Sequence, residues 1–75
     1  MLAERPALVT RCTSVSIHGV PYVDVVLEVE GGPALTARLG PEAVPAGLRE
    51  GERVVAVLVM ATVIELRRVL EGDET

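Results

Sequence analysis

Seven consecutive apolar residues, Val54–Met60, constrain the fold more than any other feature of this sequence. Four of the seven are valine, and β-branched side chains favour a strand over a helix. A strand that is apolar at every position presents apolar side chains to both faces of its sheet, so both faces need cover. A chain of 75 residues has material for one domain and buries only about 60–65% of its unfolded surface. We therefore expect neighbouring subunits to cover the second face of this strand.

The composition narrows the class of protein further. Fourteen of the 75 residues are valine, the seven basic residues are all arginine, and the net charge is -4. An acidic chain with one tyrosine lacks the basic stripe and the stacking rings that nucleic-acid binding needs. A single cysteine, Cys12, excludes an internal disulfide framework and a cysteine-based zinc site. No apolar run is long enough to cross a membrane, and the first residues do not resemble a signal peptide, so we expect a cytoplasmic protein without membrane insertion.

The first half of the chain predicts three strands, Leu8–Ile17, Tyr22–Glu30 and Leu35–Leu39. Turn residues separate them at His18–Pro21 and Gly31–Pro33, and the last two strands form a predicted hairpin. In the second and third strands apolar and polar residues alternate, which indicates one buried and one solvent-exposed face. In the first strand the alternation predicts one shared face for four residues, Val9, Thr13, Val15 and Ile17.

The second half predicts a short helix and a fourth strand, followed by an ambiguous tail. Pro41 suits the first turn of a helix within the segment 40–51, where Leu48 is expected to plug the core. Residues 62–71 fit either a helix, through a capping-box pattern, or a fifth strand, through their β-branched residues. Since five strands close a small barrel better than four, we favour the strand. We expect one domain over residues 3–70 and a frayed tail at 71–75.

This order of elements predicts an all-β fold, a small five-stranded antiparallel barrel that resembles the OB-fold. The short helix or turn lies between the third and fourth strands. Closing the sheet into a barrel would also remove the exposed edges that a valine-rich sheet otherwise presents.

No group of residues predicts catalysis. His18 is a turn residue, Cys12 has no neighbour that would favour a thiolate, and Arg67-Arg68 is interpreted as a wet end of the chain. Three carboxylates on one strand face are interpreted as a solvated surface rather than a metal site: Asp24, Glu28 and Glu30. We therefore expect a binding protein and not an enzyme. Small hydroxyls could hold an oxyanion by hydrogen bonds, and the candidates are Thr10, Thr13, Ser14, Ser16, Thr36 and Thr62.

Several motifs together resemble the molybdopterin-binding-protein (Mop) and TOBE domains. The stretch Leu35–Leu39 reads LTARL, and Gly47–Ala56 follows the family pattern GLxEGxxVxA. Val59–Ile64 occupies the place of the family's KASxVI segment, and Ala3–Pro6 is similar to its SARN motif. The resemblance covers residues 3–66, nearly the whole chain.

The resemblance implies an OB-like barrel that binds molybdate or tungstate between subunits of a homo-oligomer, from dimer to hexamer. Fused copies of such domains belong to ABC-transporter ATPases and to molybdate-responsive regulators, which links the family to transport. Carried onto this sequence, the family pattern assigns the arginine place of SARN to Arg5 and the serine place of KAS to Ala61 or Thr62. Ser14 or Thr36, together with backbone N–H groups, would complete the implied oxyanion site.

Two alternative functions remain open, one because the sequence departs from the Mop/TOBE pattern and one because it also resembles a second family. The family's lysine is replaced by Val59 or, with a one-residue gap, by Met60, which favours a ligand-less oligomerisation or regulatory domain. The length and the late strand also resemble an OB-like chaperone family of hydrogenase maturation. That family depends on a cysteine directly after the initiator methionine, where this chain has Leu2.

Overall fold

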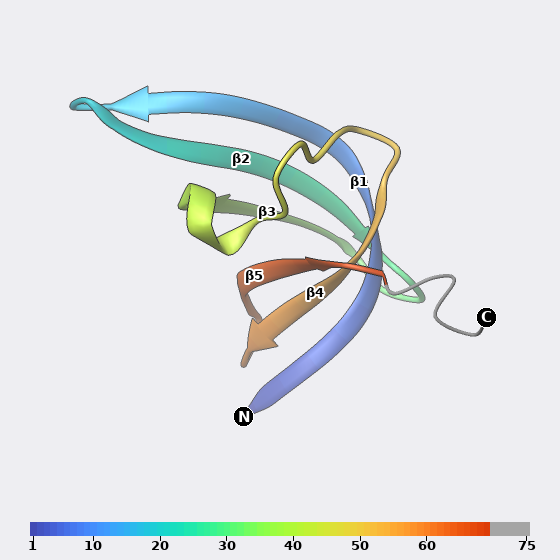
Figure 1. The fold of residues 1–75 in the computed structure, drawn as a ribbon. Helices are drawn as coiled ribbons and strands as arrows, with labels where there is room; N and C mark the ends of the chain where they lie inside the picture. Colours follow the sequence, from blue (N-terminus) through green and yellow to red (C-terminus); the bar gives the residue numbers. More distant parts are fainter. Residues whose placement is uncertain (70–75) are drawn as a thin grey trace.

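The computed structural model describes residues 1–69 and contains five strands and one short 3₁₀ turn (Figure 1). The all-β prediction is confirmed, and the ambiguous segment after Ala61 is a strand rather than a helix. The expected frayed tail at 71–75 lies outside the described residues. None of the described residues form a helix long and apolar enough to span a membrane. The elements are β1 (Leu2–Ile17), β2 (Val20–Val29), β3 (Ala34–Leu39), η1 (Pro41–Ala43), β4 (Arg53–Val59) and β5 (Thr62–Arg68).

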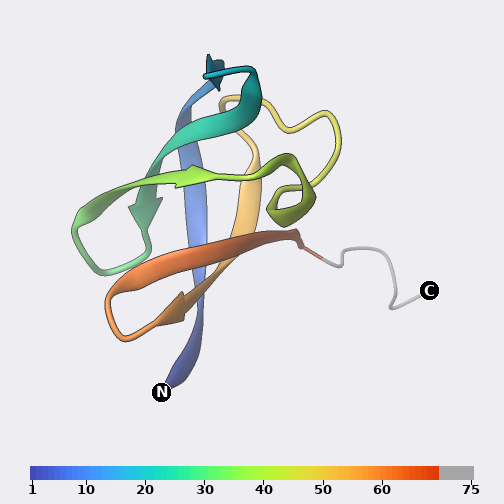
Figure 2. The same ribbon diagram turned by 90° about the vertical axis from the view of Figure 1, so that its left-hand side faces the viewer.

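The five strands form one antiparallel sheet in the order β3-β2-β1-β4-β5. The sheet curls so far that its two outer strands, β3 and β5, lie against each other, with η1 beside their ends (Figure 2). Within residues 1–69 no ladder of hydrogen bonds joins β3 to β5, so packing rather than pairing brings the two ends of the sheet together. This is the OB-like arrangement that the sequence predicts.

β1 is longer than predicted, because it begins at Leu2 instead of Leu8. Pro6 interrupts the sequence pattern there, but it lies one residue beyond the last β1–β2 pair, Ala7 with Val29. Its carbonyl accepts a hydrogen bond from the Glu30 N–H at 3.0 Å, and its missing N–H leaves no ladder bond unmade. The segment 2–8 pairs with β4 on the other side.

A β-bulge between Val9 and Arg11 reverses the faces of β1. Val9 is fully buried, whereas Thr13, three residues past the bulge, lies on the outer face opposite Asp24. Cys12 turns inward instead, opposite the buried Val25. The predicted common face of Val9, Thr13, Val15 and Ile17 is therefore wrong, because the extra residue shifts the alternation by one position.

The core lies inside the curled sheet and is entirely apolar among the described residues. All five strands contribute to it, and Leu48 packs against it from the loop, as predicted. The predicted alternation of β2 and β3 is confirmed at every core position. The buried core residues are Ala7, Val9, Val25, Leu27, Val29, Leu39, Val54, Ala56, Leu58, Val63 and Leu66.

The outer face of β4 is covered differently from the expectation. Val57 is only 1% exposed although it lies outside the core cluster, in register with Glu4 on one side and Glu65 on the other. Arg67 pairs with both carboxylates, at 3.2 Å to Glu4 and 3.3 Å to Glu65, so ionic side chains of the same chain surround this valine. Val57 thus needs no second subunit to cover it, whereas Val59 remains 37% exposed.

The ends of β1 and β2, residues 11–24, form an arm that extends from the barrel (Figure 1) and has only two strands beyond the last β2–β3 pair, Val23 with Leu39. A two-residue turn joins the strands, and both turn residues have positive φ, 53° at His18 and 78° at Gly19. The predicted turn was longer, but Val20 and Pro21 already pair with Ile17 and Ser16.

Candidate functional site

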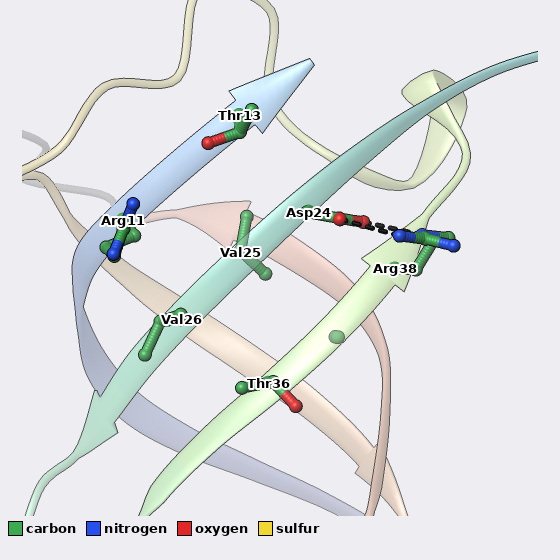
Figure 3. A pocket seen from close by; sticks show the side chains of 8 residues that line it. Arg11, Thr13, Asp24, Val25, Val26, Thr36 and Arg38 are labelled. Atoms are coloured by element: carbon green, nitrogen blue, oxygen red, sulfur yellow. Dashed lines mark hydrogen bonds and ion pairs between the residues drawn. The ribbon is translucent and has the colours of Figure 1, made fainter. Parts of the chain in front are cut away.

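A shallow groove on the outer face of β1, β2 and β3 brings polar side chains together (Figure 3). The three strands run side by side there, so alternate residues of each strand point to the same surface. Two arginines and two threonines face this groove with one carboxylate between them. The lining residues are Arg11, Thr13, Asp24, Val25, Val26, Thr36, Ala37 and Arg38.

The carboxylate of Asp24 is already satisfied by Arg38. The guanidinium donates two hydrogen bonds to it, at 2.7 and 2.8 Å, across the β2–β3 pair. The hydrogen bonds from Arg38 lower the pKa of the Asp24 carboxyl, so this pair stays ionised and neutral overall. Arg11 has no ion-pair partner among residues 1–69, which leaves one positive charge beside the hydroxyls of Thr13 and Thr36. Such a set can donate hydrogen bonds to an anion.

The predicted oxyanion residues do not converge within one chain. Thr36 lies in this groove, whereas Ser14 lies on the opposite face of the sheet. Arg5 is exposed, in register with the buried Ala56, and its guanidinium lies beside Gly32 at the β2–β3 turn. Ala61 and Thr62 are exposed at the β4–β5 turn.

Ser14 borders a second depression, between the arm and the loop that follows η1. Cys12 lies in the same depression, and its thiol points to the Leu48 carbonyl with 3.7 Å between sulfur and oxygen. Burial raises the pKa of the Cys12 thiol, and the negative charges of Glu50 and Glu52 raise it further. The thiol is therefore protonated at neutral pH, in line with the absence of a neighbour that would favour a thiolate, although Cys12 is partly rather than fully buried.

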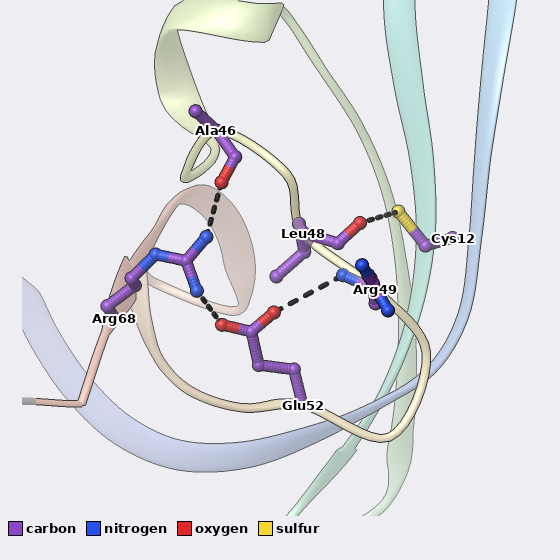
Figure 4. A network of polar contacts seen from close by, with 6 residues as sticks. All are labelled: Cys12, Ala46, Leu48, Arg49, Glu52 and Arg68. Atoms are coloured by element: carbon purple, nitrogen blue, oxygen red, sulfur yellow. Dashed lines mark hydrogen bonds and ion pairs between the residues drawn. The ribbon is translucent and has the colours of Figure 1, made fainter.

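Arg68 fastens this loop to the barrel (Figure 4). Its guanidinium donates hydrogen bonds to the Ala46 carbonyl and to the Glu52 carboxylate. Glu52 also accepts a hydrogen bond from the Arg49 N–H at 3.3 Å. The interpretation of Arg67-Arg68 as a solvent-exposed end of the chain was incomplete. Arg67 forms ion pairs over the outer face of β4, and Arg68 forms hydrogen bonds to the loop. Nothing in the local sequence signals these contacts, since their partners are 16 or more residues away except for Glu65.

The part of the chain that the structure describes holds no cluster of three metal-ligating residues. Its candidate site is a surface of hydroxyls and arginines, which can bind by hydrogen bonds and charge.

Comparison with known proteins gives one match. The family model of the TOBE domain matches residues 5–64, which span all five strands except the first residues of β1 and the last of β5. No curated protein and no solved structure matches the chain.

Proposed function

Because this chain belongs to the TOBE domain family, we propose that it is a non-enzymatic module that binds a small oxyanion, molybdate or tungstate, at interfaces between identical subunits. Its role would be storage, homeostasis or regulation of transport of the anion. The family match over residues 5–64 is the observation that carries this proposal.

The positions of the candidate residues support a site shared between subunits. Arg5 and Thr62 are both exposed, and they belong to different faces of the barrel wall, since Arg5 is in register with the core residue Ala56 and Thr62 with the outward Val59. No carboxylate within residues 1–69 forms an ion pair with Arg5. A cation and a hydroxyl that cannot meet in one chain can meet across an interface between two copies.

Calorimetric titration with molybdate, tungstate and sulfate tests the proposal. We expect saturable heat with the first two anions and weaker binding after Arg5→Ala, by about 10–100-fold, because a hydrogen bond to a charged group contributes about 1.5–3 kcal/mol. Arg49→Ala is the matched control, since Arg49 is also exposed and its side chain has no ion pair in the described structure. Absence of heat and of any thermal shift at millimolar anion would refute oxyanion binding.

One observation favours a second candidate function, a ligand-less assembly or regulatory domain. The β4–β5 turn, where the family carries a lysine, offers no cation, and Met60 occupies a positive φ of 59° there. At this turn a dianion would have only uncharged donors of the same chain. This candidate predicts an oligomer in solution whose mass and melting temperature do not respond to molybdate or tungstate.

A further inference from the structure

The arm leaves one strand edge without a partner. β1 pairs with β4 over residues 2–8, and from residue 11 to the turn its only partner strand within residues 1–69 is β2. Near Val9 the open side is closed by the loop, which bonds to the Val9 N–H and carbonyl through Glu52 and Gly51, at 2.9 and 2.7 Å. The free edge therefore begins past the bulge and ends at Ile17.

The register identifies the backbone groups that face outward on this edge. The two-residue turn makes Ile17 and Val20 the closing hydrogen-bonded pair, and hydrogen-bonded pairs then alternate along the arm. The residues between them, Cys12, Ser14 and Ser16, point their N–H and carbonyl groups away from β2. None of these six groups has a backbone partner outside the β1–β2 ladder within residues 1–69.

The other edge of the arm is protected. Beyond the last β2–β3 pair, the backbone of Pro21 faces away from β1, because Pro21 is paired with Ser16. A proline has no N–H, so this edge of β2 offers no donor to a further strand there. The β1 edge has no comparable protection against pairing, because residues 11–17 contain no proline and only one charged residue, Arg11. The two edges of one arm are thus built differently, one closed and one open.

The arm also lacks the support that a two-stranded ribbon needs. An isolated pair of strands is marginal in water, and independent stability requires more strands or a packed face. One face of this arm carries two apolar cross-strand pairs, Val15 with Tyr22 and Ile17 with Val20, and Val20 is 47% exposed.

We propose that the free edge of β1, residues 11–17, pairs antiparallel with the same edge of a second copy of this chain across a two-fold axis at Ser14. The inference rests on the proposed self-assembly but not on the ligand. A two-fold axis at Ser14 sets Ser14 against itself and Cys12 against Ser16 of the other copy, so all three outward residues meet outward residues. Their N–H and carbonyl groups form six hydrogen bonds, and the sheets of the two copies become continuous across the axis. The side chains on the line of contact are small, which lets the two backbones approach.

Disulfide trapping tests the register directly. Paired residues of this type have Cα atoms about 5.5 Å apart, within the usual range for a disulfide. We expect Ser14→Cys, made in a Cys12→Ser background, to form a covalent dimer of twice the 7.9 kDa chain mass under mild oxidation. Ala34→Cys in the same background is the control, because Ala34 is exposed on β3 and away from the edge. Cross-linking no faster than in the control would overturn the proposed pairing.

A proline variant tests the assembly without a cross-linking reaction. Ser14→Pro removes an outward N–H and no β1–β2 hydrogen bond, so light scattering should give at most half the mass of the unchanged chain, while Ser14→Ala keeps the original mass. Circular dichroism verifies that both variants remain folded. An unchanged mass for a folded Ser14→Pro would refute the edge pairing, whereas a monomeric unchanged chain would refute the proposed self-assembly itself. Titration of the unchanged chain with molybdate reports separately on the ligand.

Discussion

Replacing Val57 by alanine tests whether this chain covers both faces of its most apolar strand by itself. Val57 is 1% exposed and lies between the carboxylates that Arg67 bridges, whereas Val59, two residues further on the same strand and also opposite β1 and β5, is 37% exposed. Val57→Ala deletes two buried methyl groups and leaves a cavity, which should lower the free energy of unfolding by roughly 1.5–3 kcal/mol. In a domain of this size each kcal/mol corresponds to about 4–8 °C in melting temperature, so a fall of about 6–24 °C is expected.

Val59→Ala is the matched control, with an expected loss below about 1 kcal/mol because its side chain already contacts water. Urea unfolding followed by circular dichroism measures both variants at several protein concentrations. If the cover is internal, the difference between the two variants persists at the lowest concentration. Equal losses in the two variants, or a Val57→Ala effect that vanishes on dilution, would refute the internal cover and restore the need for a neighbouring subunit.

Three further outcomes are expected. In an NMR titration the Asp24 carboxyl should titrate below its ordinary pKa of 3.8, since Arg38 stabilises the charged form. The Asp24–Arg38 pair therefore stabilises the fold above pH 3.8, and this stabilisation is lost as the pH falls through the lowered pKa of Asp24. Arg38→Ala should return the titration to the ordinary range, and an unmoved curve would contradict the assigned cause. The Cys12 thiol should react with iodoacetamide at pH 8 more slowly in the folded chain than in urea, and equal rates would contradict its burial. Arg68→Ala should release the loop and speed tryptic cleavage after Arg49, with circular dichroism as the check that the barrel persists.

The alternation of β2 and β3 was sufficient to predict these two strands and their inward faces, and the uninterrupted apolar run was sufficient to predict β4 as a strand but not which of its residues face the core. The bulge in β1 was not predictable, because Thr10 and Arg11 carry no turn signal and only the pairing with β2 reveals the extra residue. The start of β1 was missed because Pro6 resembles an interruption, and its place beyond the end of a ladder becomes visible only in the sheet.

The candidate site was predicted less completely than the fold. The family resemblance gives Arg5, Ser14, Thr36, Ala61 and Thr62 as candidate oxyanion residues, but it does not say which of them meet. In the structure of one chain these residues lie on different faces and at different ends of the sheet, and spacing along the sequence carries no information on that placement. The long-range role of Arg68 was missed for a related reason, because a hydrogen bond to a loop carbonyl at Ala46 depends on the loop's path rather than on residue type.

The proline at position 21 bears on how large an assembly can grow. A ribbon with two open edges can recruit a new copy at each side and so polymerise without limit, as in a fibre. Here one edge of the arm lacks a donor at Pro21, and the other would be used up entirely when two copies join. If the arms pair as proposed, growth through them would stop at two chains, and a larger ring would have to be built from such pairs through a different surface. A single proline would in this way limit association through the arms to pairs of chains.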